Sequence, residues 1–226
     1  MMVLAPCSAG GRSKPDGFPV LPFPLQQSIA SAELGGALTS SMVSLVIGGA
    51  RSGKSRFAQS LGTGAQRAIY IATARAEDAE MEARIAEHRR MRPADWCTVE
   101  APVEIAEAVE HHRSQCDFLL LDCLTVWLSN FCWEHRENAE HDIETASLTE
   151  IARVAGAAAE AHVVLVSNEV GCGLVPESPL GRFFRDLQGR VNQEAARLAD
   201  QVFHVVAGIA VPIKRPEMSP RQSRAW

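Results

Sequence analysis

Residues 48–55 constrain this chain more than any other stretch, because they read GGARSGKS and have the spacing G-x-x-x-x-G-K-S of a phosphate-binding loop. The apolar run 42–47 precedes them and RFAQSL, residues 56–61, follows, which predicts a buried strand before the loop and a helix after it. Backbone N–H groups in such a loop surround a polyphosphate, and the helix start adds the positive end of its dipole. The sequence therefore predicts a nucleotide site, against the alternative of a glycine-rich turn with an exposed lysine.

Each residue of this phosphate loop is a candidate nucleotide contact. The set is Gly48, Gly49, Ala50, Arg51, Ser52, Gly53, Lys54 and Ser55. Gly48 and Gly53 permit backbone angles that other residues avoid. Lys54 is expected to reach the β and γ phosphates, and Ser55 is expected to bind Mg²⁺, which we take as the cofactor.

From residue 43 onward, short apolar segments alternate with longer amphipathic ones. The predicted strands are 43–47, 68–73, 97–100, 118–122, 163–167 and 202–206, and the predicted helices are 53–62, 77–91, 103–113, 124–133, 142–161 and 181–199. Strands that are apolar on both faces and separated by helices indicate a parallel sheet covered on both sides. We predict an α/β fold of the P-loop, RecA-like type, with a mostly parallel sheet in a single catalytic domain over residues 42–214.

The two ends of the chain differ from this pattern. Residues 1–41 are expected to be a disordered N-terminal extension, and Met42, just before the first strand, is a candidate start of translation. Prolines interrupt the apolar run 18–25, which argues against a secretory signal. No run approaches the ~18 apolar residues of a membrane span. Residues 215–226 are expected to form a flexible tail.

Charge and cysteine usage limit the partners and the compartment. The net charge of −5 provides no overall positive field to attract nucleic acid. The six cysteines form no C-x-x-C pair, which favours a reducing cytoplasm. Cys132 and His135 have the spacing of half a metal site, but no second half is nearby, so a structural role is favoured.

Two acidic residues lie at the carboxyl ends of predicted strands, where ligands gather in parallel sheets. Asp122 ends FLLLD and is expected to orient Mg²⁺, although it could instead cap the next helix together with Thr125. Glu169 follows the strand 163–167 and is a candidate contact to Mg²⁺ or to a substrate hydroxyl.

His88 lies in the charged helix 77–91, on one face with Met81 and Ile85. A neutral imidazole can act as a nucleophile. On sequence alone, however, a histidine on such a helix is more often a packed or solvated bystander.

Four segments together resemble one enzyme family. They are the phosphate loop GGARSGKSRFA, residues 69–102 (IYIATARAEDAEMEARIAEHRRMRPADWCTVEAP), residues 119–130 (LLLDCLTVWLSN) and residues 163–193 (VVLVSNEVGCGLVPESPLGRFFRDLQGRVNQ). In this order, they are similar to the bifunctional adenosylcobinamide kinase / adenosylcobinamide-phosphate guanylyltransferase family of cobalamin synthesis. The resemblance covers about residues 43–214.

This resemblance implies two reactions at one protein. The kinase step uses ATP or GTP to phosphorylate adenosylcobinamide, and the second step transfers GMP from GTP through a guanylylated histidine, which matches His88. Glu100 and Asp122 match acidic positions around the nucleotide, and Lys54 and Arg51 would neutralise phosphate charge. The pair His111 and His112 is the fallback for the nucleophile. Some relatives form homotrimers with the substrate site between subunits.

Two other readings stay open. A phosphate-loop kinase of another small metabolite would keep Lys54, Ser55 and Asp122 but would need no covalent intermediate. A nucleotide-binding regulatory or recombinase-like module would act through partners, and it would be expected to carry a basic surface for DNA.

Overall fold

The computed structural model describes residues 42–76, 78–159 and 161–216. Within them, one seven-stranded sheet has the order β3-β2-β4-β5-β1-β6-β7. The strands are β1 (Met42–Gly48), β2 (Ala68–Ala72), β3 (Cys97–Glu100), β4 (Phe118–Asp122), β5 (His162–Asn168), β6 (Gln201–Val206) and β7 (Ile209–Lys214). All neighbouring strands are parallel except β6 and β7. The predicted mostly parallel sheet is therefore confirmed.

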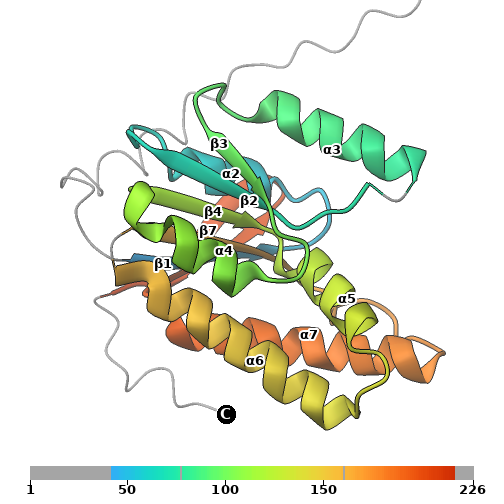
Figure 1. The fold of residues 1–226 in the computed structure, drawn as a ribbon. Helices are drawn as coiled ribbons and strands as arrows, with labels where there is room; N and C mark the ends of the chain where they lie inside the picture. The colour runs from blue at the N-terminus through green and yellow to red at the C-terminus, as the bar shows by residue number, and fades with distance from the viewer. Residues whose placement is uncertain (1–41, 77, 160, 217–226) are drawn as a thin grey trace, which may run out of the picture. The chain divides into compact units, whose positions relative to one another are not determined.

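Helices cover both faces of the sheet, as predicted (Figure 1). They are α2 (Lys54–Ser60), α3 (Ala79–Met91), α4 (Ile105–His112), α5 (Leu124–Glu134), α6 (Glu140–Gly156) and α7 (Pro179–Leu198), with 3-10 turns at Arg113–Gln115 and Ala157–Ala159. Leu45 and Leu119 pack on the face covered by α4 to α7. Val46 and Leu120 pack on the opposite face with Ala58 of α2. Successive side chains of a strand thus enter different layers, which explains why the strands are apolar on both faces.

The antiparallel strand β7 is absent from the sequence prediction. Pro212 interrupts its apolar pattern, and a proline argues against a central strand. The sheet order places β7 at the edge, where a missing N–H is tolerated. Ala207 and Gly208, with φ of 51° and 81°, make the tight turn that joins it to β6.

The predicted helix bounds differ from the observed ones by a few residues. The helix predicted from residue 77 begins at Ala79, because the side chain of Asp78 caps it by accepting a hydrogen bond from Met81 N over 2.7 Å. The helix predicted over 142–161 is observed as α6 over Glu140–Gly156, followed by the short 3-10 turn. The predictions for residues 1–41, including the start at Met42, and for 217–226 of the tail lie outside the described residues.

Candidate active site

The phosphate loop joins β1 to α2, and two of its glycines are required by the backbone. A Cβ atom on Gly48 would lie 2.4 Å from Val205 O and 2.8 Å from Ser52 Oγ. Since Val205 O belongs to the main chain of β6, it cannot rotate away. Gly53 precedes α2 with a φ of 94°, in the left-handed region that favours glycine.

The β6–β7 turn lies against the same loop. Gly208 N donates a hydrogen bond to Ser52 O over 2.8 Å. A Cβ atom on Gly53 would lie 3.2 Å from Gly208 Cα. The sequence analysis missed this support because it did not predict β7, and the Ala207-Gly208 turn was its only local signal.

Lys54 is a buried cation inside the loop. It is 9% exposed, and its Nζ donates to Gly49 O over 3.2 Å. Among the described residues, no carboxylate forms an ion pair with it. A buried charge without a counter-charge is unfavourable. Gly49, Ala50 and Arg51 are exposed at the mouth of the loop, so an anion can reach Lys54 from solvent.

Asp122 ends β4 and points to the α2 side of the sheet. It shares a face with Leu120, two residues earlier, which packs in the same apolar cluster as Ala58 of α2. Tyr70 on the neighbouring strand donates its hydroxyl hydrogen to Asp122 Oδ2 over 3.0 Å. The carboxylate therefore lies on the side where α2 begins with Lys54 and Ser55.

The alternative role of Asp122 as a helix cap is wrong. The N-cap of α5 is Cys123, and no side chain makes the capping hydrogen bond. Thr125, expected to share that duty, instead accepts a hydrogen bond from Asn168 N over 3.0 Å. Its hydroxyl thus joins the first turn of α5 to the end of β5.

The oxygen donors near the loop suit Mg²⁺. Ser55 and Asp122 are both half-buried, and Asp122 Oδ1 accepts no hydrogen bond from any described residue. Ser52 Oγ is buried and also lacks a partner within the described part of the chain. Hydroxyl and carboxylate oxygens are the ligands that Mg²⁺ uses beside substrate phosphates. The described residues contain no cluster of three or more His, Cys, Asp or Glu that could hold a metal without such phosphates.

The other metal candidate, Cys132 with His135, makes contacts within its own helix. His135 Nδ1 lies 2.8 Å from Phe131 O, and its ring stacks on Phe131 with the centroids 4.2 Å apart. Burial raises the pKa of Cys132 to about 11. The imidazole is engaged by its own helix, and in the described part of the chain these two residues belong to no group of three or more His, Cys, Asp or Glu that could hold a metal.

The end of β5 is fixed against the phosphate loop. Glu169 N donates to Gly48 O over 3.2 Å, so this main chain continues beside the loop. The Glu169 carboxylate accepts a contact from Cys172 Sγ at 3.8 Å and stays half-buried. Its predicted ligand contact stays a prediction.

A buried polar network, which sequence reasoning missed, holds this strand end from α7. Ser167 Oγ donates to Asn192 Oδ1 over 2.6 Å, and Gln188 Nε2 donates to both over 3.1 and 2.9 Å. Asn192 Nδ2 then donates to Asn168 O over 3.1 Å. The helical spacing of Gln188 and Asn192 was the only signal for it.

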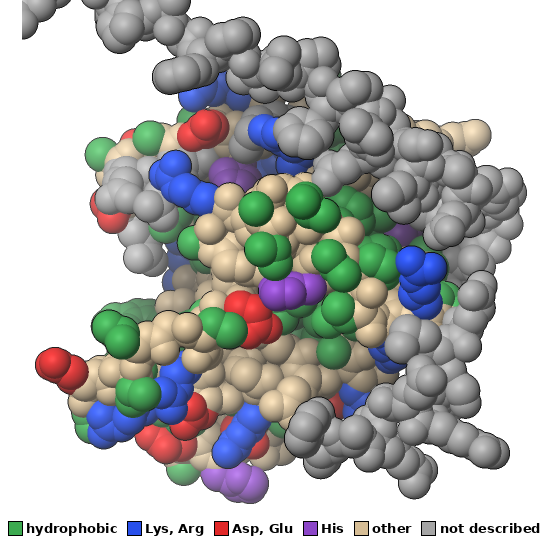
Figure 2. All heavy atoms as spheres, turned by 180° about the vertical axis from the view of Figure 1, so that it is seen from behind, with side chains coloured by type: hydrophobic (Ala, Val, Ile, Leu, Met, Phe, Trp, Pro, Cys, Tyr) green, Lys and Arg blue, Asp and Glu red, His purple; other side chains and the backbone are tan. Residues whose placement is uncertain are grey.

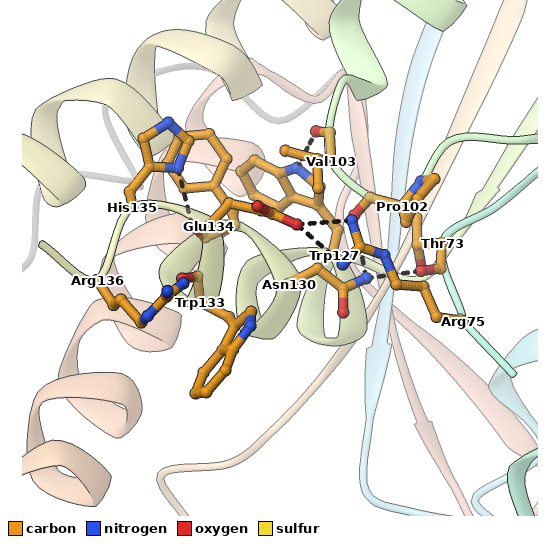
Figure 3. A network of polar contacts seen from close by, with 11 residues as sticks. Thr73, Arg75, Pro102, Val103, Trp127, Asn130, Trp133, Glu134, His135 and Arg136 are labelled. Atoms are coloured by element: carbon orange, nitrogen blue, oxygen red, sulfur yellow. Dashed lines mark hydrogen bonds and ion pairs between the residues drawn. The ribbon is translucent and has the colours of Figure 1, made fainter. Parts of the chain in front are cut away.

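Helix α5 organises the loops after β2 and β3 (Figure 3). Asn130 Nδ2 lies between two carbonyl oxygens, Thr73 O at 2.9 Å and Pro102 O at 3.1 Å. Trp127 Nε1 donates to Val103 O over 2.7 Å. Two loops at the same sheet edge are thereby fixed to one helix.

A cavity of about 340 Å³ lies beside these loops, at the end of β3. Its lining includes Arg75, Glu100, Pro102, Val103, His111 and His112. Arg75 is anchored to Glu134 by two hydrogen bonds of 3.0 and 2.9 Å (Figure 3). The histidine pair is therefore placed at this cavity and not at the phosphate loop.

The structure does not bring His88 and Glu100 to the phosphate loop within one chain. Arg89, the neighbour of His88 on α3, donates to Glu100 Oε1 over 2.5 Å. Gly48 on β1 and Glu100 on β3 are four strand spacings apart in the sheet order, which corresponds to roughly 19 Å between main chains. By the same count, Asp122 on β4 lies two strand spacings from each of them.

The fold is similar to that of a solved ATPase. A solved structure of a prototypical ATPase from the type III secretion system of pathogenic bacteria matches with a TM-score of 0.50 and 9% identity, over 76% of this chain and 57% of that chain. This likeness shows the fold alone. No helix in the described part of the chain is both long and apolar enough to cross a bilayer.

Sequence comparisons identify the family. The bifunctional adenosylcobalamin biosynthesis protein CobU of Escherichia coli (strain K12) is 43% identical over 181 residues, which cover 76% of this chain and 100% of that protein. The corresponding protein CobP of Pseudomonas aeruginosa is 41% identical over 177 residues and 98% of its length. The family described as cobinamide kinase / cobinamide phosphate guanyltransferase matches residues 44–213. The chain is thus an enzyme with a P-loop fold, and it belongs to the cobinamide kinase / cobinamide phosphate guanyltransferase family.

Proposed function

We propose that this enzyme phosphorylates the aminopropanol hydroxyl of adenosylcobinamide with ATP or GTP. It then transfers GMP from GTP to the new phosphate, which gives adenosylcobinamide-GDP and pyrophosphate. Family membership supports the pair of reactions. The observation that carries the nucleotide site is Lys54, a buried ammonium at an open glycine loop with no carboxylate paired to it among the described residues.

In the kinase step, the substrate hydroxyl oxygen attacks the γ-phosphorus and the bond to the β-phosphate oxygen breaks. Lys54 and Arg51 would neutralise the charge on the phosphates, which accounts for most of the catalysis in such transfers. Mg²⁺, when bound, supplies further charge neutralisation, and Ser55 and Asp122 are the residues that would hold it.

In the guanylyl step, a neutral ring nitrogen of His88 attacks the α-phosphorus of GTP. A P–N bond forms, the bond to pyrophosphate breaks, and the imidazole loses a proton. The phosphate oxygen of adenosylcobinamide phosphate then attacks the same phosphorus, the P–N bond breaks, and the imidazole takes back a proton. One difficult displacement becomes two easier ones.

The position of α3 bears on how His88 meets the nucleotide. Within one chain, Arg89 of α3 is hydrogen-bonded to Glu100 at the end of β3, which is four strand spacings from the phosphate loop. We propose that the enzyme is a homotrimer in which α3 of one subunit serves the loop of its neighbour. Glu100, held by Arg89, would then lie with His88 around the guanine nucleotide.

Labelling with GTP tests the covalent step. The protein is incubated with α-labelled GTP and Mg²⁺ and denatured, and the label should survive alkali but be lost in mild acid. His88→Ala should abolish this label, and His111→Ala, the matched control at the cavity, should keep it. Label retained at the wild-type level in His88→Ala would remove His88 from the mechanism.

The same assay distinguishes this mechanism from the alternative function, a kinase without a covalent intermediate. A kinase of another small metabolite would take no label, and His88→Ala would leave its phosphorylation rate unchanged. The separation of α3 from the loop in one chain is the observation that favours this second candidate.

We also propose that the enzyme acts in the cytoplasm. Five cysteines in the described residues are free thiols: Cys97, Cys116, Cys123, Cys132 and Cys172. Free thiols are typical of a reducing compartment.

A further inference from the structure

Tyr70 connects the phosphate site to the rest of the sheet. It is the single tyrosine of the chain and is 2% exposed. In the strand pairing, Tyr70 lies opposite Leu120 on β4, and Ala72 lies opposite Asp122. The hydroxyl of Tyr70 therefore has to reach two residues along β4, toward its carboxyl end. There it donates to Asp122 Oδ2 over 3.0 Å. A phenol of this length spans that offset, whereas a phenylalanine would end short of the carboxylate.

The ring of Tyr70 is held by the end of α3. The guanidinium carbon of Arg92, the residue after α3, lies 3.4 Å from the ring centroid. Arg92 Nη1 also donates to Thr98 Oγ1 on β3 over 3.1 Å. A guanidinium stacked on an aromatic face is attracted by the ring quadrupole. Arg92 therefore links α3 to both β2 and β3.

The hydroxyl of Tyr70 is the donor in this hydrogen bond, because an ionised carboxylate can only accept. A protonated phenol that donates to Oδ2 fixes the rotation of the carboxylate. Oδ1 has no hydrogen-bond donor among the described residues and so can face a ligand.

We propose that Tyr70 is a positioning residue that couples α3 to the phosphate site, with Arg92 holding its ring and its hydroxyl orienting Asp122. This inference rests on the proposed function in that Asp122 acts on nucleotide-bound Mg²⁺. It adds that α3, which carries His88, and the Asp122 carboxylate at the end of β4 share one chain of contacts. A displacement of α3 would then change the orientation of Asp122.

Nucleotide affinity with and without Mg²⁺ tests the orienting role. The probe is a non-hydrolysable GTP analogue, and the measured quantity is the factor by which Mg²⁺ tightens its binding. Tyr70→Phe should reduce that factor about tenfold, the effect of one hydrogen bond to a charged group, and leave Mg²⁺-free binding unchanged. If Tyr70 had only a structural role, Tyr70→Phe would weaken the affinities with and without Mg²⁺ equally. That result would overturn the inference.

Asp122→Asn in the same assay separates the two hypotheses. If it removes the Mg²⁺ effect and Tyr70→Phe does not, the role of Tyr70 is wrong and the proposed metal role of Asp122 stands. If Asp122→Asn retains the Mg²⁺ effect, the metal role fails, and the inference about Tyr70 fails with it. The double variant Tyr70→Phe with Asp122→Asn should show the same effect of Mg²⁺ on binding as Asp122→Asn alone.

A second measurement leaves both Tyr70 and Asp122 unchanged. Because the chain has one tyrosine, ring-labelled tyrosine gives a single NMR signal from Tyr70. Adding Mg²⁺ to the protein saturated with the analogue should shift this signal, and Arg92→Met should shift it without any ligand. A signal that moves in neither case would refute the coupling, whatever the folding of Tyr70→Phe.

Discussion

The main-chain N–H of Gly208 donates a hydrogen bond to Ser52 O over 2.8 Å, so the β6–β7 turn supports the phosphate loop directly. Beside it, the main chain of β6 leaves no room for a side chain on Gly48. The end of β6 and the start of β7 therefore shape the nucleotide site, although they are more than a hundred residues away in sequence.

Hydrophobic side chains also gather on the face of the molecule seen from behind, around a histidine (Figure 2).

Gly48→Ala should lower the free energy of unfolding by about 1–3 kcal/mol, because the new methyl group overlaps the main chain of Val205. Gly49→Ala is the matched control, since nothing lies within 4 Å of a Cβ atom there. Urea unfolding of both variants without nucleotide measures the difference. Equal stabilities would show that the β6 main chain can retreat from the loop.

Lys54→Met should have opposite effects on binding and on stability. Nucleotide affinity should fall roughly tenfold to a hundredfold because a charged hydrogen-bond donor to phosphate is lost. The stability without nucleotide should stay the same or rise, because a buried cation is replaced by an apolar chain of similar length. Calorimetric titration and thermal unfolding measure the two quantities, with the exposed Arg56→Met as control. A marked loss of stability would mean that Lys54 supports the loop even without an anion.

Mixed oligomers test whether the site is shared between subunits. Subunits with His88→Ala keep a phosphate loop, and subunits with Lys54→Met keep the nucleophile. Neither homo-oligomer should form the acid-labile guanylyl adduct, whereas mixtures refolded together should recover a fraction of it. Mixtures that stay inactive, although they form mixed oligomers by mass spectrometry, would place both residues in the same subunit.

The pH dependence of stability should include a contribution from His162. Burial lowers the pKa of His162 from its ordinary value of 6.5 to about 4, and the charge of Asp200 partly opposes this. Between these two pH values, the unfolded chain binds a proton that the folded chain does not. The free energy of unfolding should therefore fall as the pH drops from 6.5 to 4, by at most roughly 3 kcal/mol.

The measurement is urea unfolding between pH 7.5 and 4.5, compared with His162→Gln. That variant should show a shallower slope in this window, and the exposed His141→Gln should keep the wild-type slope. His162 Nε2 lies 2.9 Å from Ser44 Oγ, so His162→Gln can lower stability at every pH; the slope is the quantity that decides.

Lys214 should contribute to stability by capping a helix. Its Nζ donates to Ala196 O and Arg197 O over 2.9 and 3.1 Å, and also to Ala199 O, at the carboxyl end of α7. Lys214→Met should lower the free energy of unfolding by about 1 kcal/mol, and Lys214→Arg should restore part of it. Thermal unfolding measures both. No loss in Lys214→Met would mean that water satisfies these carbonyls equally well.

The sequence alone predicted the parts of the fold that depend on local pattern. Six strands and the helices between them follow from apolar runs and amphipathic spacing, and their bounds agree with the structure to within a few residues. The phosphate loop is likewise local, because its glycines and Lys54 lie within eight consecutive residues. A strand, a tight turn and a helix start need only neighbouring residues to be recognised.

The tertiary structure decided which distant residues meet. It assigned Tyr70, and not a helix end, as the partner of Asp122, and it placed Gly208 against Ser52. It also set the strand order that separates α3 from the phosphate loop. These relationships join residues that are tens to more than a hundred positions apart, and they depend on how strands order themselves to bury both faces of the sheet. No local pattern in the sequence specifies that order, which is why the distance between Glu100 and the phosphate loop became visible only in the folded chain.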